Sequence, residues 1–218
     1  LHDALPILRR AGRKWPRVYC LKGDIRKYFP SIDHDVLKRI IRRRIGCPDT
    51  LSMIDEIIDH SGDVGIPIGN LTSQLFANIY LDQLDHFVKD DLGESYYLRY
   101  MDDFCLLDGE KSRLHRLYDE IRGYLQNVLH LGMNDKTQVF PVGSRAIDFL
   151  GYRIREDVRL LRKQNVRRMR RRIKKLAGQA CAGILSWAAF RPHLDSWLGH
   201  CLYADSYRIR NSIMRSAG

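Results

Sequence analysis

Two adjacent acidic residues in the middle of the chain have the type and spacing to bind a divalent cation. Asp102 and Asp103 lie between two aromatic and aliphatic runs, residues 96–100 and 104–107. Two such runs joined by polar residues predict a β-hairpin with the acids at its tip. Carboxylates fixed side by side repel each other unless a cation lies between them, so the pattern favours a metal site. An ordinary solvated turn is the alternative, because Asp is a common turn residue.

A third acid, Asp24, lies at the end of another predicted strand. Residues 17–25 are β-branched and aromatic with near-alternation, which predicts a strand that ends close to Asp24. If this strand pairs with the hairpin, three carboxylates converge, and they form the usual ligand set for two Mg²⁺ ions that also bind phosphate oxygens. Such a centre catalyses nucleotidyl transfer without a protein nucleophile.

The composition favours a folded protein that binds a polyanion. The 218 residues are 44% hydrophobic, enough for one large core or two small ones, and the net charge is +11. This charge predicts association with nucleic acid, with an anionic membrane surface as the alternative. No apolar run approaches the roughly 20 residues that cross a bilayer, so we expect no membrane partner. Five cysteines without a close pair fit neither a disulfide framework nor a zinc site and favour a reducing, cytoplasmic location.

Three helices are predicted around the strands. Asp33 is placed to cap the first helix. A loop rich in glycine and proline, residues 65–69, precedes a second helix with an apolar stripe of Leu71, Leu75 and Ile79 that continues towards residue 88. Residues 114–129 have helical apolar spacing and should pack one face on a sheet.

The C-terminal third changes in composition near residue 155. Before it, two short apolar runs, residues 138–141 and 146–154, flank a Gly-Ser turn and predict a second hairpin. After it, residues 159–175 contain ten Arg or Lys beside an apolar stripe and predict a basic amphipathic helix. Contact with phosphate is the favoured role of this helix, and a merely solvated face is the alternative.

The motifs resemble, in order, those of reverse transcriptases. Residues 21–32, 65–74 and 100–103 look like motifs A, B and C of that family. Residues 131–137 resemble motif D, and residues 149–152 resemble the primer-grip motif E. The resemblance is greatest to the reverse transcriptases of diversity-generating retroelements, which are related to the group II intron and retron enzymes.

The resemblance implies an α+β fold with the palm of a right-hand polymerase, an antiparallel sheet with packed helices, followed by a helical thumb. Residues 1–16 would be a remnant of the fingers or a linker, residues 17–155 the palm, and residues 156–218 the basic thumb. The fingers would be largely missing, since few residues precede motif A and the chain does not begin with Met. We therefore expect a fragment of a longer polypeptide.

The resemblance also assigns the chemistry to particular residues. Asp24, Asp102 and Asp103 would be catalytic and would bind two Mg²⁺ ions, with Mn²⁺ as a substitute, together with the Ile25 carbonyl. Lys136 would protonate the leaving pyrophosphate, although most lysines in so basic a chain are simply solvated.

Further positions would contact the substrates. Phe29 would be the steric gate that excludes a ribose 2′-OH, with a core Phe beneath the strand as the alternative. The implied nucleotide-binding set is Phe29, Ile68, Gly69, Ser73, Gln74 and Tyr100. The implied primer grip is Phe149, Leu150, Gly151 and Tyr152. The implied nucleic-acid contacts are Arg167, Arg168, Arg170, Arg171, Arg172, Lys174 and Lys175.

Motif B departs from the common pattern of the family, which has glutamine before the glycine and proline after the serine. Here Ile68 precedes Gly69, and Gln74 follows Ser73. An isoleucine offers packing where glutamine would offer an amide hydrogen bond, so a contact that checks base-pair geometry is lost. This favours the error-prone retroelement type over ordinary fidelity.

The expected function is therefore an RNA-directed DNA polymerase that extends a DNA or cDNA primer with dNTPs and uses RNA as the template. We expect it to be bacterial or phage-encoded and to have an accessory variability protein as a partner. Alternatives are a group II intron or retron-like enzyme of ordinary fidelity, an RNA-dependent RNA polymerase, which Phe29 and Met101 disfavour, and a non-catalytic nucleic-acid-binding module. We expect this fragment to bind nucleic acid but to polymerise poorly or not at all.

Overall fold

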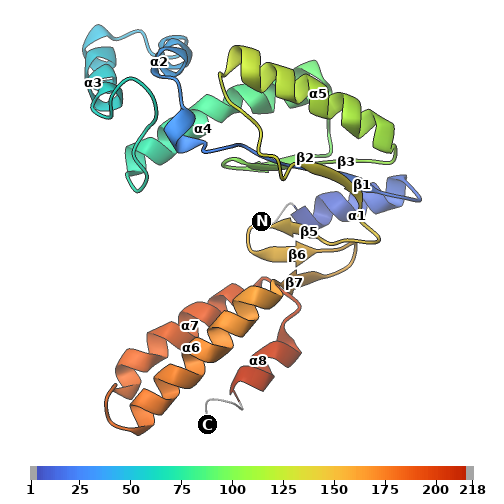
Figure 1. Cartoon of the computed structure of the whole chain (residues 1–218), viewed down its shortest axis with the longest axis vertical. Helices are drawn as coiled ribbons and strands as arrows, with labels where there is room; N and C mark the ends of the chain where they lie inside the picture. Colours follow the sequence, from blue (N-terminus) through green and yellow to red (C-terminus); the bar gives the residue numbers. More distant parts are fainter. Residues whose placement is uncertain (1–3, 215–218) are drawn as a thin grey trace. The chain divides into compact units, whose positions relative to one another are not determined.

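The chain divides into two compact units in the computed structural model, which describes residues 4–214 (Figure 1). One unit is residues 13–141, and the other combines residues 1–12 with residues 142–218. The contact boundary after Pro141 thus precedes the change in composition near residue 155. The assignment of palm and thumb to residues 17–155 and 156–218 stays a prediction.

A four-stranded antiparallel sheet forms the centre of the first unit. Its strand order is β2-β3-β1-β4, where β1 is Tyr19–Asp24, β2 is Tyr97–Tyr100, β3 is Asp103–Asp108 and β4 is Gln138–Pro141. The strand predicted to end near Asp24 and the hairpin that carries the acids are both confirmed. β1 and β3 are the two inner strands, so the acids lie at the ends of the central pair.

The two faces of this sheet differ because side chains alternate along each strand. Leu21, Phe104 and Leu106 point to one face and are buried in the core. The register places Asp24 opposite Asp103 on the other face. Gly23 is required on the apolar face, since a Cβ there would come within 2.2 Å of the Phe104 ring.

Helices α4 (Leu71–His86) and α5 (Lys111–Val128) cover the apolar face (Figure 1). Helix α2 (His34–Arg42) packs beside α4, and the Asp33 side chain caps it by accepting from the Val36 N–H, as predicted. Helix α3 (Pro48–Asp59), which follows α2, was not predicted from the sequence, although Pro48 at the first helical position is a recognised start signal.

The second predicted helix is confirmed as α4, and Ile79 of its predicted apolar stripe packs against the core, but Leu71 and Leu75 do not. Leu71 and Leu75 are 83% and 58% exposed, and Phe76, Tyr80 and Leu84 are buried instead. Both stripes have helical spacing, so periodicity alone could not choose between them. The aromatic pair buries more area, and the Tyr80 hydroxyl donates to the Leu129 carbonyl at 2.7 Å, which fixes the helix in this rotation.

The second unit contains a three-stranded antiparallel sheet, β5-β6-β7, and most of the remaining helices. Its strands are β5 (Ile147–Phe149), β6 (Tyr152–Ile154) and β7 (Arg159–Leu161). Its helices are α6 (Lys163–Cys181), α7 (Trp187–Leu202), α8 (Tyr207–Met214) and most of α1 (Ala4–Lys14). Helices α6 and α7 lie side by side (Figure 1).

Two predictions for this region are corrected. β4 pairs with β1, not with β5, so residues 138–141 and 146–154 do not form one hairpin. The hairpin instead turns at Leu150 and Gly151, whose φ values of 50° and 86° suit a two-residue turn. The basic helix begins at Lys163, because residues 159–161 are paired with β6 as β7.

Short 3₁₀ and π turns complete the described part. A 3₁₀ turn spans Phe29–Ser31, and a π turn spans Phe87–Asp91 at the end of α4. Within residues 4–214, none of the helices has the length and apolarity to span a bilayer.

Candidate functional site

The three acids predicted to be catalytic come together at one end of the central strands. Asp24 and Asp103 are direct partners across β1 and β3, and Asp102 lies in the turn before β3. The Ile25 N–H donates to the Asp102 carbonyl at 3.2 Å, which joins the turn to the end of β1. Residues distant in sequence are therefore placed side by side by strand register.

The two acids of the turn have different electrostatic surroundings. Asp103 forms an ion pair with Lys22, whose side chain is 16% exposed. Burial and then the charge of Asp24 raise the pKa of Asp102 above its ordinary value. Asp103 is thus neutralised by a neighbouring cation, whereas Asp102 faces another carboxylate.

Asn134 holds Asp24 in place, and sequence reasoning did not single it out. Its side-chain amide donates to Asp24 Oδ2 at 2.8 Å, and its main-chain N–H donates to the Asp24 carbonyl at 2.8 Å. Its side-chain oxygen accepts from the Lys136 N–H at 3.1 Å. The signal that could have found it is the Asn-Asp-Lys run, since Asn side chains bond the backbone two residues on in such turns.

These bonds bring residues 131–137 against the end of β1. The Arg26 N–H donates to the Gly132 carbonyl at 2.8 Å, and Ile25 forms a β-bridge with Met133. The Ile25 carbonyl takes part in none of these bonds. Lys136 lies in the same segment with an exposed side chain. The segment that resembles motif D therefore lies beside Asp24.

The donor set is chemically suited to Mg²⁺, which prefers carboxylate oxygens and keeps several waters. However, no group of three or more His, Cys, Asp or Glu side chains within residues 4–214 is arranged to hold a metal ion. Asp103 is paired with Lys22, whose ammonium group competes with a metal ion for this carboxylate. Asp24 and Asp102 are left as the two acids whose charges interact.

Phe29 lies beyond Asp24 in a 3₁₀ turn and is half-buried against the core. Its carbonyl accepts from the Ile66 N–H at 3.0 Å, which links it to the loop that resembles motif B. Gly65 in this loop has a φ of 85°, and a Cβ would come within 2.9 Å of the Pro30 carbonyl oxygen. The glycine thus permits the close approach of the two motifs.

The other predicted nucleotide-binding residues differ in accessibility. Ile68, Gly69 and Gln74 are exposed, and so is Tyr100 at the end of β2, where it is the register partner of Asp103. Ser73 is buried on α4. The structure therefore makes four of these residues accessible to a ligand and places Ser73 within the protein.

The predicted primer-grip residues form the hairpin of the second unit. Phe149 and Tyr152 are buried, and Leu150 and Gly151 make the turn. The Tyr152 hydroxyl lies 2.9 Å from both Nδ1 and the main-chain oxygen of His200 on α7. Burial lowers the pKa of His200, which fits a neutral ring in a structural role.

The predicted nucleic-acid contacts on α6 all have exposed side chains. Within the described residues none of them pairs with a carboxylate, while Arg170 donates to Ser212 at 3.0 Å and Arg172 lies 3.1 Å from His193. The members of this set are Arg167, Arg168, Arg170, Arg171, Arg172, Lys174 and Lys175. The helix therefore presents an uncompensated positive surface.

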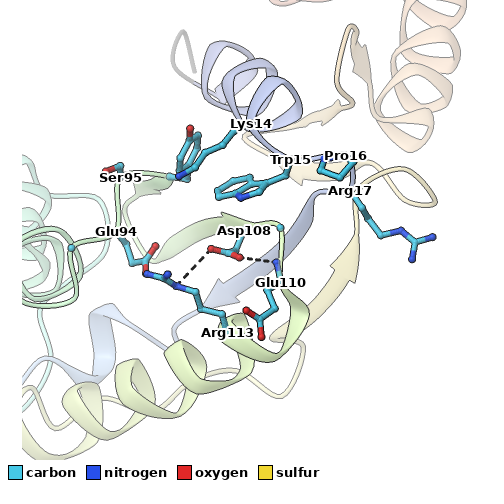
Figure 2. A pocket seen from close by; sticks show the side chains of 12 residues that line it. Lys14, Trp15, Pro16, Arg17, Glu94, Ser95, Asp108, Glu110 and Arg113 are labelled. Carbon is cyan, nitrogen blue, oxygen red and sulfur yellow. Dashed lines mark hydrogen bonds and ion pairs between the residues drawn. The ribbon is translucent and has the colours of Figure 1, made fainter.

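A pocket of about 410 Å³ at the other end of β3 is a separate feature (Figure 2). The Trp15 and Tyr96 rings are 4.7 Å apart there, and Lys14 Nζ lies 4.7 Å above the Trp15 ring. Arg113 forms an ion pair with Glu94 at 2.6 Å. Arg113 also lies 3.7 Å from Asp108, and none of the residues that line this pocket belongs to the five motifs, so the acid cluster is the better candidate site.

A four-stranded antiparallel sheet with acids at the ends of its two central strands and helices packed on one face is the arrangement of a polymerase palm. The chain belongs to the reverse transcriptase (RNA-dependent DNA polymerase) family, whose pattern it matches over residues 3–154.

Curated relatives include the protein YkfC of Escherichia coli strain K12, which is 27% identical over 178 residues that cover 62% of this chain and 46% of YkfC. The group II intron-encoded protein LtrA of Lactococcus lactis subsp. cremoris is 33% identical over 98 residues, 40% of this chain and 16% of LtrA. The chain thus spans less than half the length of these relatives.

Solved structures support the fold. Apo telomerase from Candida tropicalis aligns with a TM-score of 0.60 at 13% identity, over 99% of this chain and 48% of that one. Telomerase of the same species in complex with a fragment of telomeric RNA aligns with a TM-score of 0.56 at 15% identity, over 91% and 40%. The predicted α+β fold of the palm-and-thumb type is confirmed.

Proposed function

We propose that this chain is the catalytic region of an RNA-directed DNA polymerase that elongates a DNA primer on an RNA template. The observation that supports this most directly is the placement of Asp24 opposite Asp103, with Asp102 in the adjoining turn. Family membership and the order of the five motifs support the same reaction.

Asp24 and Asp102 would be the principal Mg²⁺ ligands, helped by the Ile25 carbonyl, and Asp103 would join them when it leaves Lys22. Bound Mg²⁺ would activate the primer hydroxyl and stabilise charge on the leaving pyrophosphate. Asn134 would keep the Asp24 carboxylate oriented. Lys136 is close in the chain to Asn134 and is the proposed proton donor.

Template, primer and dNTPs would be bound by the remaining predicted residues. Tyr100, the register partner of Asp103, is exposed to solvent, and so is the motif B loop at Ile68 and Gly69. Phe29 would select against ribose. The Phe149 to Tyr152 hairpin would grip the primer, and the cations of α6 would bind phosphates as part of the thumb. In this proposal, residues 17–155 are the palm and residues 156–218 the thumb.

The first experiment is primer extension on poly(rA)/oligo(dT) with Mg²⁺. Asp102→Asn should abolish any extension carried out by a protein that contains this chain, and retained activity would refute the metal assignment. For the 218-residue chain alone, we expect binding of the primer-template but little extension. Robust extension by this chain would contradict that expectation while supporting the proposed reaction.

The subtype is a separate question. Ile68 before Gly69 favours the error-prone enzyme of a diversity-generating retroelement, which would work with an accessory variability protein. An intron-type enzyme of ordinary fidelity is the second candidate, favoured by the similarity to a group II intron-encoded protein. Sequencing of cDNA from the full-length enzyme distinguishes them: errors concentrated at template adenines support the first, and an even spectrum supports the second.

A further inference from the structure

We propose that Arg99 is a positioning residue, anchored by Asp85, that holds the turn carrying Asp102 and Asp103 in the conformation needed for catalysis. This inference rests on the proposed function, because the turn is taken to bear the metal ligands. Sequence reasoning gave no role to either Arg99 or Asp85.

Arg99 uses all three of its guanidinium nitrogens in directed contacts. Its Nε donates to Asp85 Oδ1 at 2.7 Å, and one terminal nitrogen donates to Asp85 Oδ2 at 2.5 Å. The other terminal nitrogen donates to the Met101 carbonyl at 2.9 Å. The planar guanidinium therefore links a carboxylate on α4 rigidly to the backbone of the turn.

The turn needs such support because Met101 has a φ of 54°. This is the left-handed region, which is unfavourable for a residue with a side chain. The Met101 carbonyl belongs to the peptide bond that leads into Asp102. Fixing that carbonyl fixes the plane of the peptide and hence the positions of the Asp102 N and Cα atoms, from which the side chain extends.

The anchor is itself held firmly. The Arg99 side chain is 10% exposed and that of Asp85 is 23% exposed, so water competes weakly for their contacts. The buried Tyr97 donates its hydroxyl to Asp85 Oδ1 at 2.9 Å. Asp85 lies at the C-terminal end of α4, whose first residue follows the loop that contains Ile68 and Gly69. One helix thus connects the motif B loop with the catalytic turn.

The test compares variants of a protein that contains this chain. Arg99→Lys keeps the positive charge, but a lysine cannot donate to Asp85 and to the Met101 carbonyl at the same time. It should therefore lower kcat for primer extension by about 10- to 100-fold, with a KM for dNTP close to that of the wild type. Arg113→Lys alters the ion pair with Glu94, away from the turn, and serves as the matched control, with a loss of less than about 3-fold.

A double-mutant cycle with Met101→Gly separates positioning from general stability. Glycine tolerates a positive φ, so the effect of Arg99→Lys should be at least about 5-fold smaller in the Met101→Gly background. An equal effect in both backgrounds would refute the positioning role. If Arg99→Lys does not fold, Asp85→Asn is placed in the same cycle and interpreted in the same way.

Hydrogen exchange gives a measure that does not depend on catalysis. Deuterium uptake in the peptide that spans residues 97–104 should rise in Arg99→Lys and stay unchanged in Arg113→Lys. Unchanged uptake in Arg99→Lys would overturn the inference even in an active enzyme. If the wild-type protein does not extend primers but uptake still rises in Arg99→Lys, the proposed function is refuted and the restraint of the turn by Arg99 is still supported.

Discussion

Neutralising the two adjacent acids of the turn should change the stability of the metal-free protein in opposite directions. Asp103 is ion-paired with Lys22, and their side chains are 26% and 16% exposed. Asp102 instead experiences burial and repulsion from Asp24, which raise its pKa. Asn in place of either acid is nearly isosteric, so the comparison isolates the charge.

The expected magnitudes follow from these surroundings. Asp103→Asn deprives Lys22 of its carboxylate partner, and because the pair is mostly but not fully buried the cost should be about 1–2 kcal/mol, below the 3–5 kcal/mol of a fully buried pair. At this chain length that corresponds to a melting temperature lower by about 2–8 °C. Asp102→Asn removes an unfavourable charge that is only partly buried, so it should stabilise the protein by less than about 1 kcal/mol and raise the melting temperature slightly.

Thermal unfolding in EDTA at pH 7, followed by circular dichroism, measures both effects. Added Mg²⁺ should raise the melting temperature of the wild type, because a bound cation relieves the repulsion between Asp24 and Asp102, and should raise that of Asp102→Asn less. Equal losses of stability in both variants, or a loss for Asp102→Asn alone, would refute the assignment of the two electrostatic environments.

Three further outcomes are expected. Gly23→Ala should destabilise the protein by about 1–3 kcal/mol in thermal melts, because the new Cβ would collide with the buried Phe104 ring. As a control, Gly123→Ala in α5 should stabilise the protein by about 0.5–1 kcal/mol, because its Cβ would have nothing within 4 Å. The reverse order of stabilities would contradict the packing. Asn134→Ala should lower the stability of the fold by about 1 kcal/mol and weaken Mg²⁺ binding measured by calorimetry, because Asp24 loses its 2.8 Å hydrogen bond. Unchanged Mg²⁺ affinity would show that this hydrogen bond does not orient the acid. Glutamine at all seven exposed cations of α6 that are predicted to contact nucleic acid should reduce the slope of log affinity against log salt for primer-template binding, by up to about 1 unit for each side chain that contacts a phosphate. An unchanged slope would exclude phosphate contact by these side chains.

The positions of the acids were predictable because they depend on local signals. Strand alternation up to Asp24 and the hairpin runs on either side of the Asp pair indicate where each strand ends. The α2 cap by Asp33 was predictable for the same reason, since Asn and Asp bond the first-turn amides of helices.

What could not be predicted depends on partners distant in the sequence. Nothing near Lys22 indicates that it pairs with Asp103, and nothing near Arg99 indicates Asp85 on α4. The short run at residues 138–141 was assigned to the wrong hairpin because its pattern identifies a strand but not the strand it pairs with. The exposed Leu71 similarly shows that helical spacing does not decide which of two stripes is buried.

The two outer strands of the central sheet, β2 and β4, have a consequence for self-association. Each is four residues long, and β4 ends at Pro141, which has no N–H to donate to an incoming strand. Short edges and an edge proline give another chain few backbone groups with which to extend a sheet. The two outer strands therefore protect the central sheet from pairing edge to edge with a second copy of itself.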